Sequence, residues 1–336
     1  MGNRYPYRYI VTQTPLRISF AGGGTDFPDF YSRESGAVFS TSIDKFIYVT
    51  VKEHNELFME KFRLNYSETE HCNSLEDIKN AIARECLRLV PVDSSIYVST
   101  VADLPAFSGL GSSSSFSVGL LNALHAFRGE SVTPGQLAEE ASHIEINVLK
   151  RPIGKQDQYA AAFGGLNYFV FQTDGRVTLE PQTVAPHEMN RLFSYLMLFW
   201  TNITRDAASI LKEQKQNTFD NLELLVQLKH QANALRSGFL SDSGCSPEVV
   251  GRILDNSWQF KKKLATSISN EHIDQWYDRA KFAGALGGKL CGAGGGGFLC
   301  FIVPPERQQQ VRTALHDLNE VSIKYEPIGS RIIVKH

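Results

Sequence analysis

The 336-residue sequence has few cysteines and no long apolar run. Its five cysteines form no C-x-x-C pair, which argues against a disulfide framework or a zinc site and favours reduced thiols. The longest apolar run, residues 192–200, is about half the length that a membrane-spanning helix needs. The first ten residues also lack the apolar segment of a secretory signal. We therefore expect a cytoplasmic protein without a membrane partner.

The sequence also lacks a strong charge of either sign, because its formal net charge is only −2. No basic field therefore favours a nucleic-acid partner. Familiar phosphate-binding signatures are missing as well. No segment matches the Walker A pattern, and neither H-R-D nor D-F-G occurs. Residues 292–297 match G-x-G-x-x-G, but a helical pattern precedes them and an apolar strand follows, the reverse of the dinucleotide-binding context.

What the sequence does contain is enough apolar material for large cores, with 42% hydrophobic residues. A chain of this length predicts two domains. The composition shifts near residues 181–188, from strand-rich to mostly helical. We therefore place one domain at residues 1–185 and a second at residues 186–336.

One stretch, residues 109–115, reads G-L-G-S-S-S-S. An alternating β-branched segment precedes it and an apolar helical segment follows, so it is predicted to join a strand to a helix. Glycines let a backbone approach a ligand closely. Free amides at a helix N-terminus attract anions, and serine hydroxyls bind phosphate or Mg²⁺. A simple capped loop is the alternative, although four serines exceed what capping needs.

Periodicity and capping signals predict the remaining elements. Ser74 is the expected N-cap of one long helix, and the run Lys261–Lys263 is expected to be a solvated helix face. The main predicted elements are strands at 11–21, 38–52 (with a turn at 44–45), 57–66 and 95–102, helices at 74–90, 118–127 and 133–150, a hairpin at 167–180, and a final β segment at 322–334.

Three glycine-bearing motifs stand in order along the chain: R-I-S-F-A-G-G-G-T-D (17–26), the 109–115 stretch, and K-L-C-G-A-G-G-G-G-F (289–298). Together they resemble the GHMP kinase superfamily, which includes galactokinase, homoserine kinase and mevalonate kinase. The resemblance implies an α+β fold of two domains. The N-terminal domain would be ribosomal-protein-S5-like with a left-handed β-α-β unit, and the C-terminal domain would be ferredoxin-like.

The resemblance also implies ATP and Mg²⁺ as cofactors and assigns roles by motif. Asp157, in G-K-Q-D-Q (154–158), matches the general base, and Arg17 matches a basic residue near the attacking oxygen. Glu145 matches the magnesium carboxylate, with Ser112 or Ser113 beside it. The ATP phosphates are assigned to Gly109, Leu110, Gly111, Ser112, Ser113 and Ser114. The sugar is assigned to Gly22, Gly23, Gly24, Thr25, Asp26, Gly294 and Gly295.

The first motif is similar to that of the sugar-1-kinases, the heptose-phosphate kinases above all, with fucokinases nearby. The implied reaction phosphorylates the anomeric hydroxyl of D-glycero-D-manno-heptose 7-phosphate to the 1,7-bisphosphate, for nucleotide-activated heptose and surface polysaccharide. Arg205 follows a predicted strand at a helix start, so it is the candidate for holding the sugar's own phosphate.

Several alternatives remain open at this stage. The substrate could be a neutral sugar, as in a fucokinase-like enzyme, or the chain could be an inactive homologue that binds sugar and ATP. Arg17 and Arg205 could be structural, and Asp157 and Glu145 could be solvated surface acids. The sequence does not decide the oligomeric state, and a homodimer is one possibility.

Overall fold

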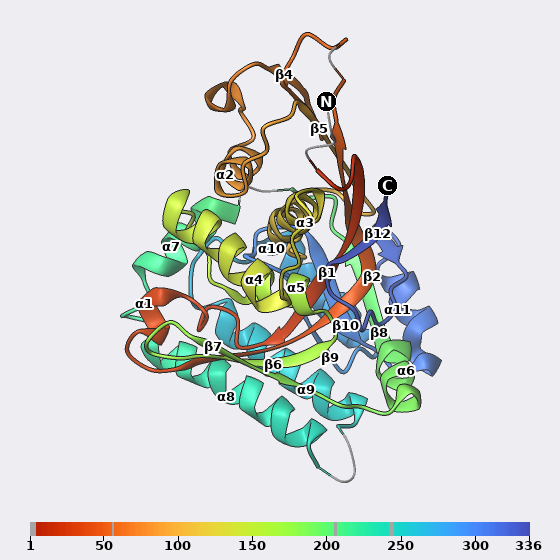
Figure 1. Cartoon of the computed structure of the whole chain (residues 1–336). Coiled ribbons are helices and arrows are strands. Elements are labelled where there is room, and N and C mark those ends of the chain that lie inside the picture. Colours follow the sequence, from red (N-terminus) through yellow and green to blue (C-terminus); the bar gives the residue numbers. More distant parts are fainter. Residues whose placement is uncertain (1–4, 56, 205–206, 242–244) are drawn as a thin grey trace.

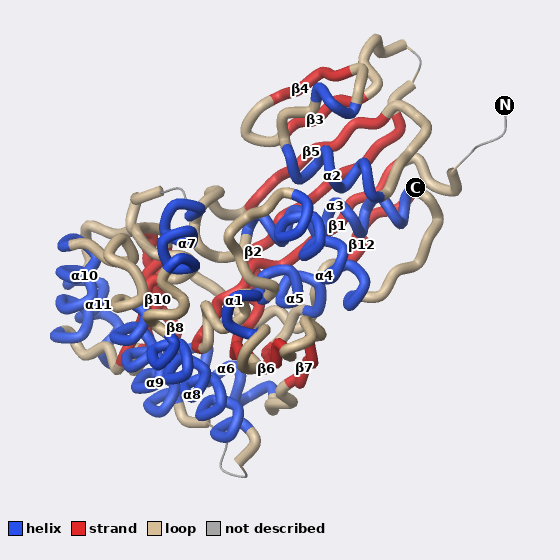
Figure 2. The backbone as a smooth tube through the Cα atoms, turned by 90° about the vertical axis from the view of Figure 1, so that its left-hand side faces the viewer, coloured by secondary structure: helices blue, strands red, loops and turns tan. Residues whose placement is uncertain are grey.

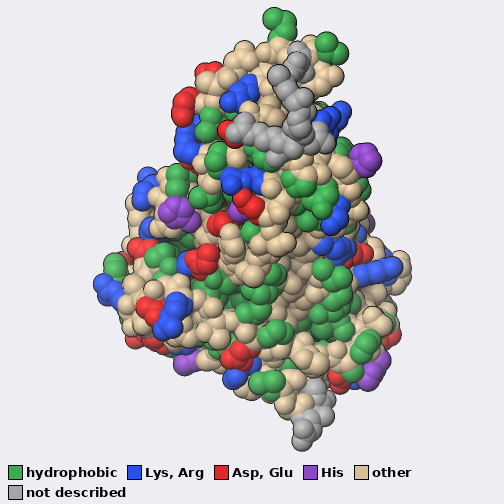
Figure 3. All heavy atoms as spheres, in the orientation of Figure 1, with side chains coloured by type: hydrophobic (Ala, Val, Ile, Leu, Met, Phe, Trp, Pro, Cys, Tyr) green, Lys and Arg blue, Asp and Glu red, His purple; other side chains and the backbone are tan. Residues whose placement is uncertain are grey.

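The computed structural model describes residues 5–55, 57–204, 207–241 and 245–336. Within these residues the chain builds two β-sheets with helices packed against both, a mixed α+β architecture (Figure 1). The expected α+β class is therefore confirmed. Among the same residues, no helix is both long and apolar enough to cross a membrane. Charged side chains of both signs are interspersed on the face seen in Figure 3.

The larger sheet has the strand order β12-β1-β2-β5-β3-β4, and β6 pairs with both β2 and β7. Its pairings are antiparallel except that of β3 with β5. Figure 2 shows β1, β2 and β5 as long neighbouring strands, with β3 and β4 at the outer edge. The strands are β1 (Tyr9–Ala21), β2 (Gly36–Glu53), β3 (Phe62–Asn65), β4 (Thr69–Cys72), β5 (Ile96–Ala102), β6 (Leu166–Phe171), β7 (Val177–Pro181) and β12 (Arg331–Lys335).

Helices of the first half cover this sheet, and α3 packs directly on β1 and β2. Helix α3 is buried over nearly its whole length because most of its residues are apolar or small. A π-helical turn, His143–Val148, follows α4. The helices are α1 (Pro28–Tyr31), α2 (Ala81–Leu89), α3 (Ser112–Phe127), α4 (Pro134–Ser142) and α5 (Gln156–Phe163).

The smaller sheet has the order β11-β8-β10-β9 and is fully antiparallel. Helix α9 packs on β9 and β10, and α8 lies between α9 and the strands of the larger sheet. The elements are α6 (Pro186–Tyr195), β8 (Leu196–Trp200), α7 (Ala207–Gln216), α8 (Leu222–Phe239), α9 (Pro247–Lys261), α10 (Glu271–Phe282), β9 (Gly287–Leu290), β10 (Phe298–Ile302), α11 (Gln308–Ala314) and β11 (Asn319–Val321).

The domain boundary near residue 185 stays a prediction. It falls between β7 and α6, but residues 331–335 return to the larger sheet, where Ile10 pairs with Lys335 and Gln13 with Arg331. The chain therefore leaves the first sheet after β7, builds the second and comes back.

Several expected elements differ from those observed. Residues 74–90 were predicted to form one helix, but a 3₁₀ turn occupies 75–77 and α2 begins only at Ala81. The predicted turn at 44–45 is an irregularity inside the continuous strand β2. The final β segment is confined to residues 331–335.

Candidate active site

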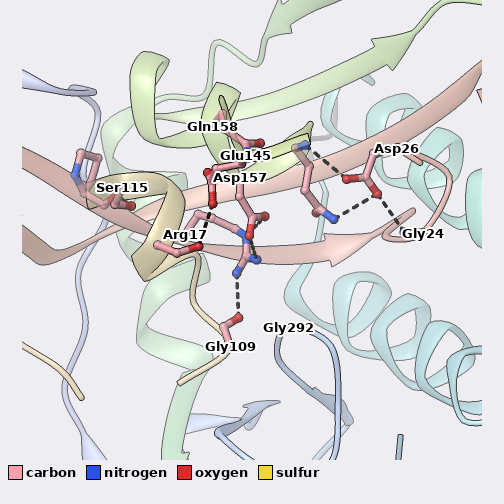
Figure 4. Close-up of polar contacts among 12 residues, drawn as sticks. Arg17, Gly24, Asp26, Gly109, Ser115, Glu145, Asp157, Gln158 and Gly292 are labelled. Carbon is pink, nitrogen blue, oxygen red and sulfur yellow. Dashed lines mark hydrogen bonds and ion pairs between the residues drawn. The ribbon is translucent and has the colours of Figure 1, made fainter. Parts of the chain in front are cut away.

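Arg17 and Asp157 form an ion pair joined by two hydrogen bonds (Figure 4). Arg17 lies near the end of β1, and Asp157 lies in the first turn of α5. The Nε–Oδ1 distance is 2.8 Å and the Nη2–Oδ2 distance is 2.7 Å. The Arg17 side chain is 5% exposed and that of Asp157 is 24% exposed. Arg17 therefore fixes the plane of the carboxylate while leaving part of it open.

The same arginine joins this pair to the 109–115 loop. Its Nη1 donates to the Gly109 carbonyl at 2.8 Å, and its backbone amide donates to the Leu110 carbonyl at 3.1 Å. Gly109 and Gly111 have φ of 81° and 82°, values that L side chains rarely adopt. Gly111 is the N-cap of α3, so the amides of the serines open this helix. The loop thus has the features of an anion site beside the ion pair.

The glycine-rich segment 292–297 packs against the back of this loop. A Cβ on Gly109 would lie 2.6 Å from the Cys291 carbonyl oxygen, and one on Gly292 would lie 2.4 Å from the Cα of Gly109. A Cβ on Gly297 would lie 2.5 Å from the Ser108 carbonyl oxygen. The backbones of the second and third motifs are in direct contact, which leaves no room for a side chain at these glycine positions.

Glu145 is fully buried and faces the serines that open α3. Ser113 Oγ donates to its Oε2 at 3.1 Å, Arg151 Nη1 donates to the same oxygen at 3.2 Å, and Gln158 Nε2 donates to Oε1 at 2.9 Å. Burial raises the pKa of Glu145, against the opposing effects of Arg151 and these hydrogen bonds.

This set of oxygens fits a magnesium ion. Mg²⁺ binds hard oxygen ligands and keeps several waters, so one carboxylate and one hydroxyl next to a phosphate loop suffice. The described residues contain no cluster of three or more histidine, cysteine or acidic side chains of the kind that cages a metal without a substrate. Ser113, an exposed residue in contact with Glu145, fits the metal role geometrically.

Asp26 is 1% exposed and links the first motif to α5. Its Oδ1 accepts from the Gly24 amide at 2.9 Å and from Gln156 Nε2 at 3.2 Å, and its Oδ2 accepts from the Gln156 amide at 3.2 Å. Burial, followed by the charge of Asp157, raises the pKa of Asp26 to about 6. Asp26 therefore holds the Gly22–Gly24 turn against the helix that carries Asp157.

Other predicted site residues lie apart from this centre. Thr25 is fully buried, and its hydroxyl is bonded to the Gly22 carbonyl and to both backbone groups of Ala37. Gly294 and Gly295 pack on Ile268, to whose carbonyl the Gly295 amide donates. Arg205 lies outside the described residues.

The sequence analysis missed four residues that surround the centre. Gln156 and Gln158 flank Asp157 and hold Asp26 and Glu145, and their place in G-K-Q-D-Q is the signal that could have revealed them. The other two are Lys261 and Lys289, both buried. The expectation that Lys261 lies on a solvated helix face is wrong. Lys261 is the last residue of α9, and its side chain is buried against the 292–297 segment, where it donates to the Gly292 carbonyl.

Comparisons with known proteins agree with this geometry. Residues 75–165 match the model of the GHMP kinases N terminal domain, and residues 246–320 match that of the GHMP kinases C terminal. The chain is 32% identical over 321 residues to D-glycero-alpha-D-manno-heptose 7-phosphate kinase of Campylobacter jejuni, covering 91% of this chain and 93% of that protein. It is 26% identical to L-fucokinase/L-fucose-1-P guanylyltransferase of Bacteroides fragilis, covering 92% of this chain but 36% of that protein.

Solved structures have the same fold. A D-glycero-D-manno-heptose 1-phosphate kinase of Bacteroides thetaiotaomicron superimposes with a TM-score of 0.79 at 25% identity, covering 97% of this chain and 99% of that one. Lactococcus lactis galactokinase superimposes with a TM-score of 0.75 at 17% identity, covering 96% and 95%. The two-domain kinase fold expected from the three motifs is confirmed, and this chain belongs to the GHMP kinase family as an ATP-dependent sugar kinase.

Proposed function

We propose that this chain transfers the γ-phosphoryl group of ATP to the anomeric hydroxyl of D-glycero-D-manno-heptose 7-phosphate, giving the 1,7-bisphosphate. The observation that carries the chemistry is the Arg17–Asp157 pair, which joins the strand of the first motif to the phosphate loop through Gly109. The relative of 32% identity, which acts on a heptose 7-phosphate, supports this choice of substrate.

In the proposed reaction the sugar's C1 oxygen attacks the γ-phosphorus while its proton passes to the Asp157 carboxylate. One P–O bond forms, the bond between the γ-phosphorus and the β-phosphate oxygen breaks, and ADP leaves. Arg17 orients Asp157 and offsets negative charge on the group in transit. Most of the acceleration in phosphoryl transfer comes from such positioning and charge neutralisation, so a partly exposed, oriented carboxylate suits the task.

The structure offers suitable groups for binding both the nucleotide and its metal ion. The amides and hydroxyls that begin α3 would hold the phosphates, with Gly109 and Gly111 letting the backbone approach them. Ser113 and Glu145 would hold Mg²⁺, which supplies charge neutralisation and alignment of the phosphates when it is bound. Gln158 and Arg151 keep the Glu145 carboxylate in place.

The test is a panel of acceptors with MgATP, measured by ADP release. The panel contains the heptose 7-phosphate, the unphosphorylated heptose, fucose, galactose and mannose. We expect the heptose 7-phosphate to have the highest kcat/KM, and phosphorus NMR to locate the new phosphate on C1. Preference for an unphosphorylated sugar would instead make the chain a fucokinase-like enzyme. Nucleotide binding without turnover on any acceptor would identify an inactive homologue.

A further inference from the structure

Two lysines from the second half of the chain lie buried beneath the candidate active site. Lys289 of β9 is 5% exposed, and its Nζ donates to the Ser19 carbonyl at 2.8 Å and the Phe20 carbonyl at 3.4 Å. Lys261, the last residue of α9, is 9% exposed, and its Nζ donates to the carbonyls of Leu290 and Gly292. Lys289 thus contacts the strand that leads into the first motif, and Lys261 contacts the third motif.

Neither ammonium group has a carboxylate partner among the residues that the structure describes. All four recorded acceptors are backbone carbonyls, which carry only partial charge. The other charged or titratable groups facing Lys289 are Arg17 of β1, Cys300 of β10 and Cys291. Lys261 faces Lys289, Cys291 and Arg17. Buried lysines are rare unless they are paired with an anion, and among the described residues this cluster has no carboxylate to pair with.

The titration behaviour of the cluster agrees with an excess of positive charge. Burial, reinforced by Arg17, lowers the pKa of Lys289 to about 8, although Cys291 opposes this shift. Burial and then the charge of Lys289 lower the pKa of Lys261 well below its ordinary value. A hydrogen bond from Cys300, followed by the charges of Lys289, Arg17 and Lys261, lowers the pKa of the Cys291 thiol to about 7.

The location of the cluster indicates which anion completes it. Lys261 fixes the Gly292 carbonyl, and Gly292 packs on Gly109 of the phosphate loop. Arg17 reaches Gly109 from the other side. We propose that Lys261 and Lys289 form a buried cationic layer whose missing counter-charge is the phosphate chain of the bound nucleotide, and that nucleotide binding draws protons into this layer. The proposal rests on the proposed function, because it takes ATP or ADP as the ligand.

The direction of the proton movement follows from linkage. An arriving polyanion stabilises the charged form of a lysine and so raises its pKa, which means that the protein takes up protons as the nucleotide binds. Near pH 8.5 a lysine with a pKa of about 8 is mostly neutral in the free protein. Near pH 6.5 it is already charged, and no uptake from it remains.

The experiment is isothermal titration calorimetry with MgADP, which binds without turnover, in buffers of different ionisation enthalpy. For the wild type we expect Lys289 to contribute about half a proton per nucleotide at pH 8.5 and almost none at pH 6.5, so the uptake is larger at pH 8.5 by this amount. Lys261, whose pKa is also lowered, can take up protons at both pH values. Lys289→Met should abolish this difference in uptake between the two pH values and weaken MgADP binding roughly tenfold, the order expected for losing one attractive charge at an effective dielectric constant of about 20. Lys289→Arg should abolish the same difference, because the arginine side chain keeps its charge at both pH values.

Two variants serve as controls. Lys262→Met removes the neighbouring lysine, whose Nζ lies 3.2 Å from Asp274 Oδ1, and should leave both the uptake and the affinity unchanged. Cys291→Ser removes the nearby thiol and should leave the uptake in place. If Cys291→Ser loses the uptake instead, the protons enter the thiol and the proposal is overturned.

The wild type alone also decides the matter should Lys289→Met fail to fold. If the binding enthalpy at pH 8.5 does not depend on the ionisation enthalpy of the buffer, no proton is taken up and the proposal is overturned. Retention of the full difference in uptake between the two pH values in Lys289→Arg overturns it as well. A wild type that phosphorylates the heptose without taking up protons keeps the proposed function and loses only this inference, whereas one that does not bind MgADP contradicts the proposed function itself.

Discussion

At the scale of single residues, Asp157 depends on a partner 140 positions away in the sequence. Asp157→Asn keeps the shape of the side chain but removes its capacity to accept a proton. We expect kcat to fall by roughly 10²–10⁴-fold, the usual size of a general-base contribution, with MgADP affinity unchanged. Steady-state kinetics at saturating acceptor measures this. Asp174→Asn, in the exposed turn after β6, is the control, and a kcat within threefold of the wild type for Asp157→Asn would exclude the base role.

The serines of the phosphate loop separate into different roles. Ser113 Oγ contacts Glu145, whereas Ser115 Oγ donates to the Pro15 carbonyl at 2.8 Å and is buried. Ser113→Ala should therefore raise the Mg²⁺ concentration needed for half-maximal activity more than it raises the KM for sugar. A magnesium titration of kcat compares it with Ser115→Ala, which should leave the Mg²⁺ requirement unchanged. Equal titrations for wild type and Ser113→Ala would remove this hydroxyl from the metal shell.

Asp26 should make stability depend on pH in an unusual direction. Its folded pKa of about 6 exceeds the ordinary value, so the folded state binds the proton more tightly than the unfolded state. The stabilisation is complete below about pH 4 and is lost as the pH rises through 6, with a total of about 1–3 kcal/mol. Urea unfolding of wild type and Asp26→Asn at pH 4 and 7 measures it. A stability difference between the two that is constant with pH would contradict this expectation.

The sequence indicated which residues belong to the motifs of the candidate site, but it did not indicate the hydrogen-bond partners of each residue. Arg17, Glu145 and Asp157 were assigned from the residue types and the order of the motifs, which are visible in the sequence, and their catalytic and metal-binding roles stay predictions. Thr25 was assigned to the sugar, yet its hydroxyl is occupied by backbone groups that only the fold brings near. Lys261 had the polarity of a surface residue, and its burial depends on β9 and the 292–297 segment reaching the end of α9.

At the scale of elements, a competing hydrogen-bond acceptor explains why the predicted helix at 74–90 is shortened. Glu70 is 6% exposed, and its carboxylate accepts from the amides of Lys79 and Asn80 at 2.6 Å and 3.0 Å. These amides are thereby bound outside a helix. Asn80 then becomes the N-cap of α2, accepting from the Ala83 amide at 3.1 Å. Local propensity marked Ser74 as the cap because the position of Glu70 in a neighbouring strand is not visible in the sequence.

The two candidate caps give a matched experiment. Asn80→Ala should lower the free energy of unfolding by about 1 kcal/mol, because the Ala83 amide loses its acceptor. Ser74→Ala should change it by less than about 0.5 kcal/mol, since Ser74 Oγ bonds only the exposed Asp77 side chain among described groups. Denaturant unfolding monitored by circular dichroism compares them. Equal losses for the two variants would mean that the helix begins earlier than the structure indicates.

At the scale of the whole molecule, β12 secures the edge of the sheet that carries Arg17. Val334 pairs with Val11 inside this ladder. Val334→Pro removes a backbone donor from an edge strand and should lower the free energy of unfolding by about 1–3 kcal/mol. Val334→Ala, which keeps the backbone donor, should cost less than about 1 kcal/mol because Val334 is 41% exposed. Thermal and urea unfolding test the pair, and equal effects would show that the β12 backbone does not stabilise the sheet.

The return of β12 to β1 also determines the order in which a growing chain can complete its structure. Synthesis releases β1 early, whereas Arg331, the partner of Gln13, emerges only after nearly all of the intervening sequence. Until then one edge of β1 has open backbone groups, which makes a nascent chain prone to pairing with other strands. Closing so long a loop is also slow. The strand that carries Arg17 is thus among the first parts translated and among the last to be completed, so chains interrupted before residue 331 retain an open, aggregation-prone edge on that strand.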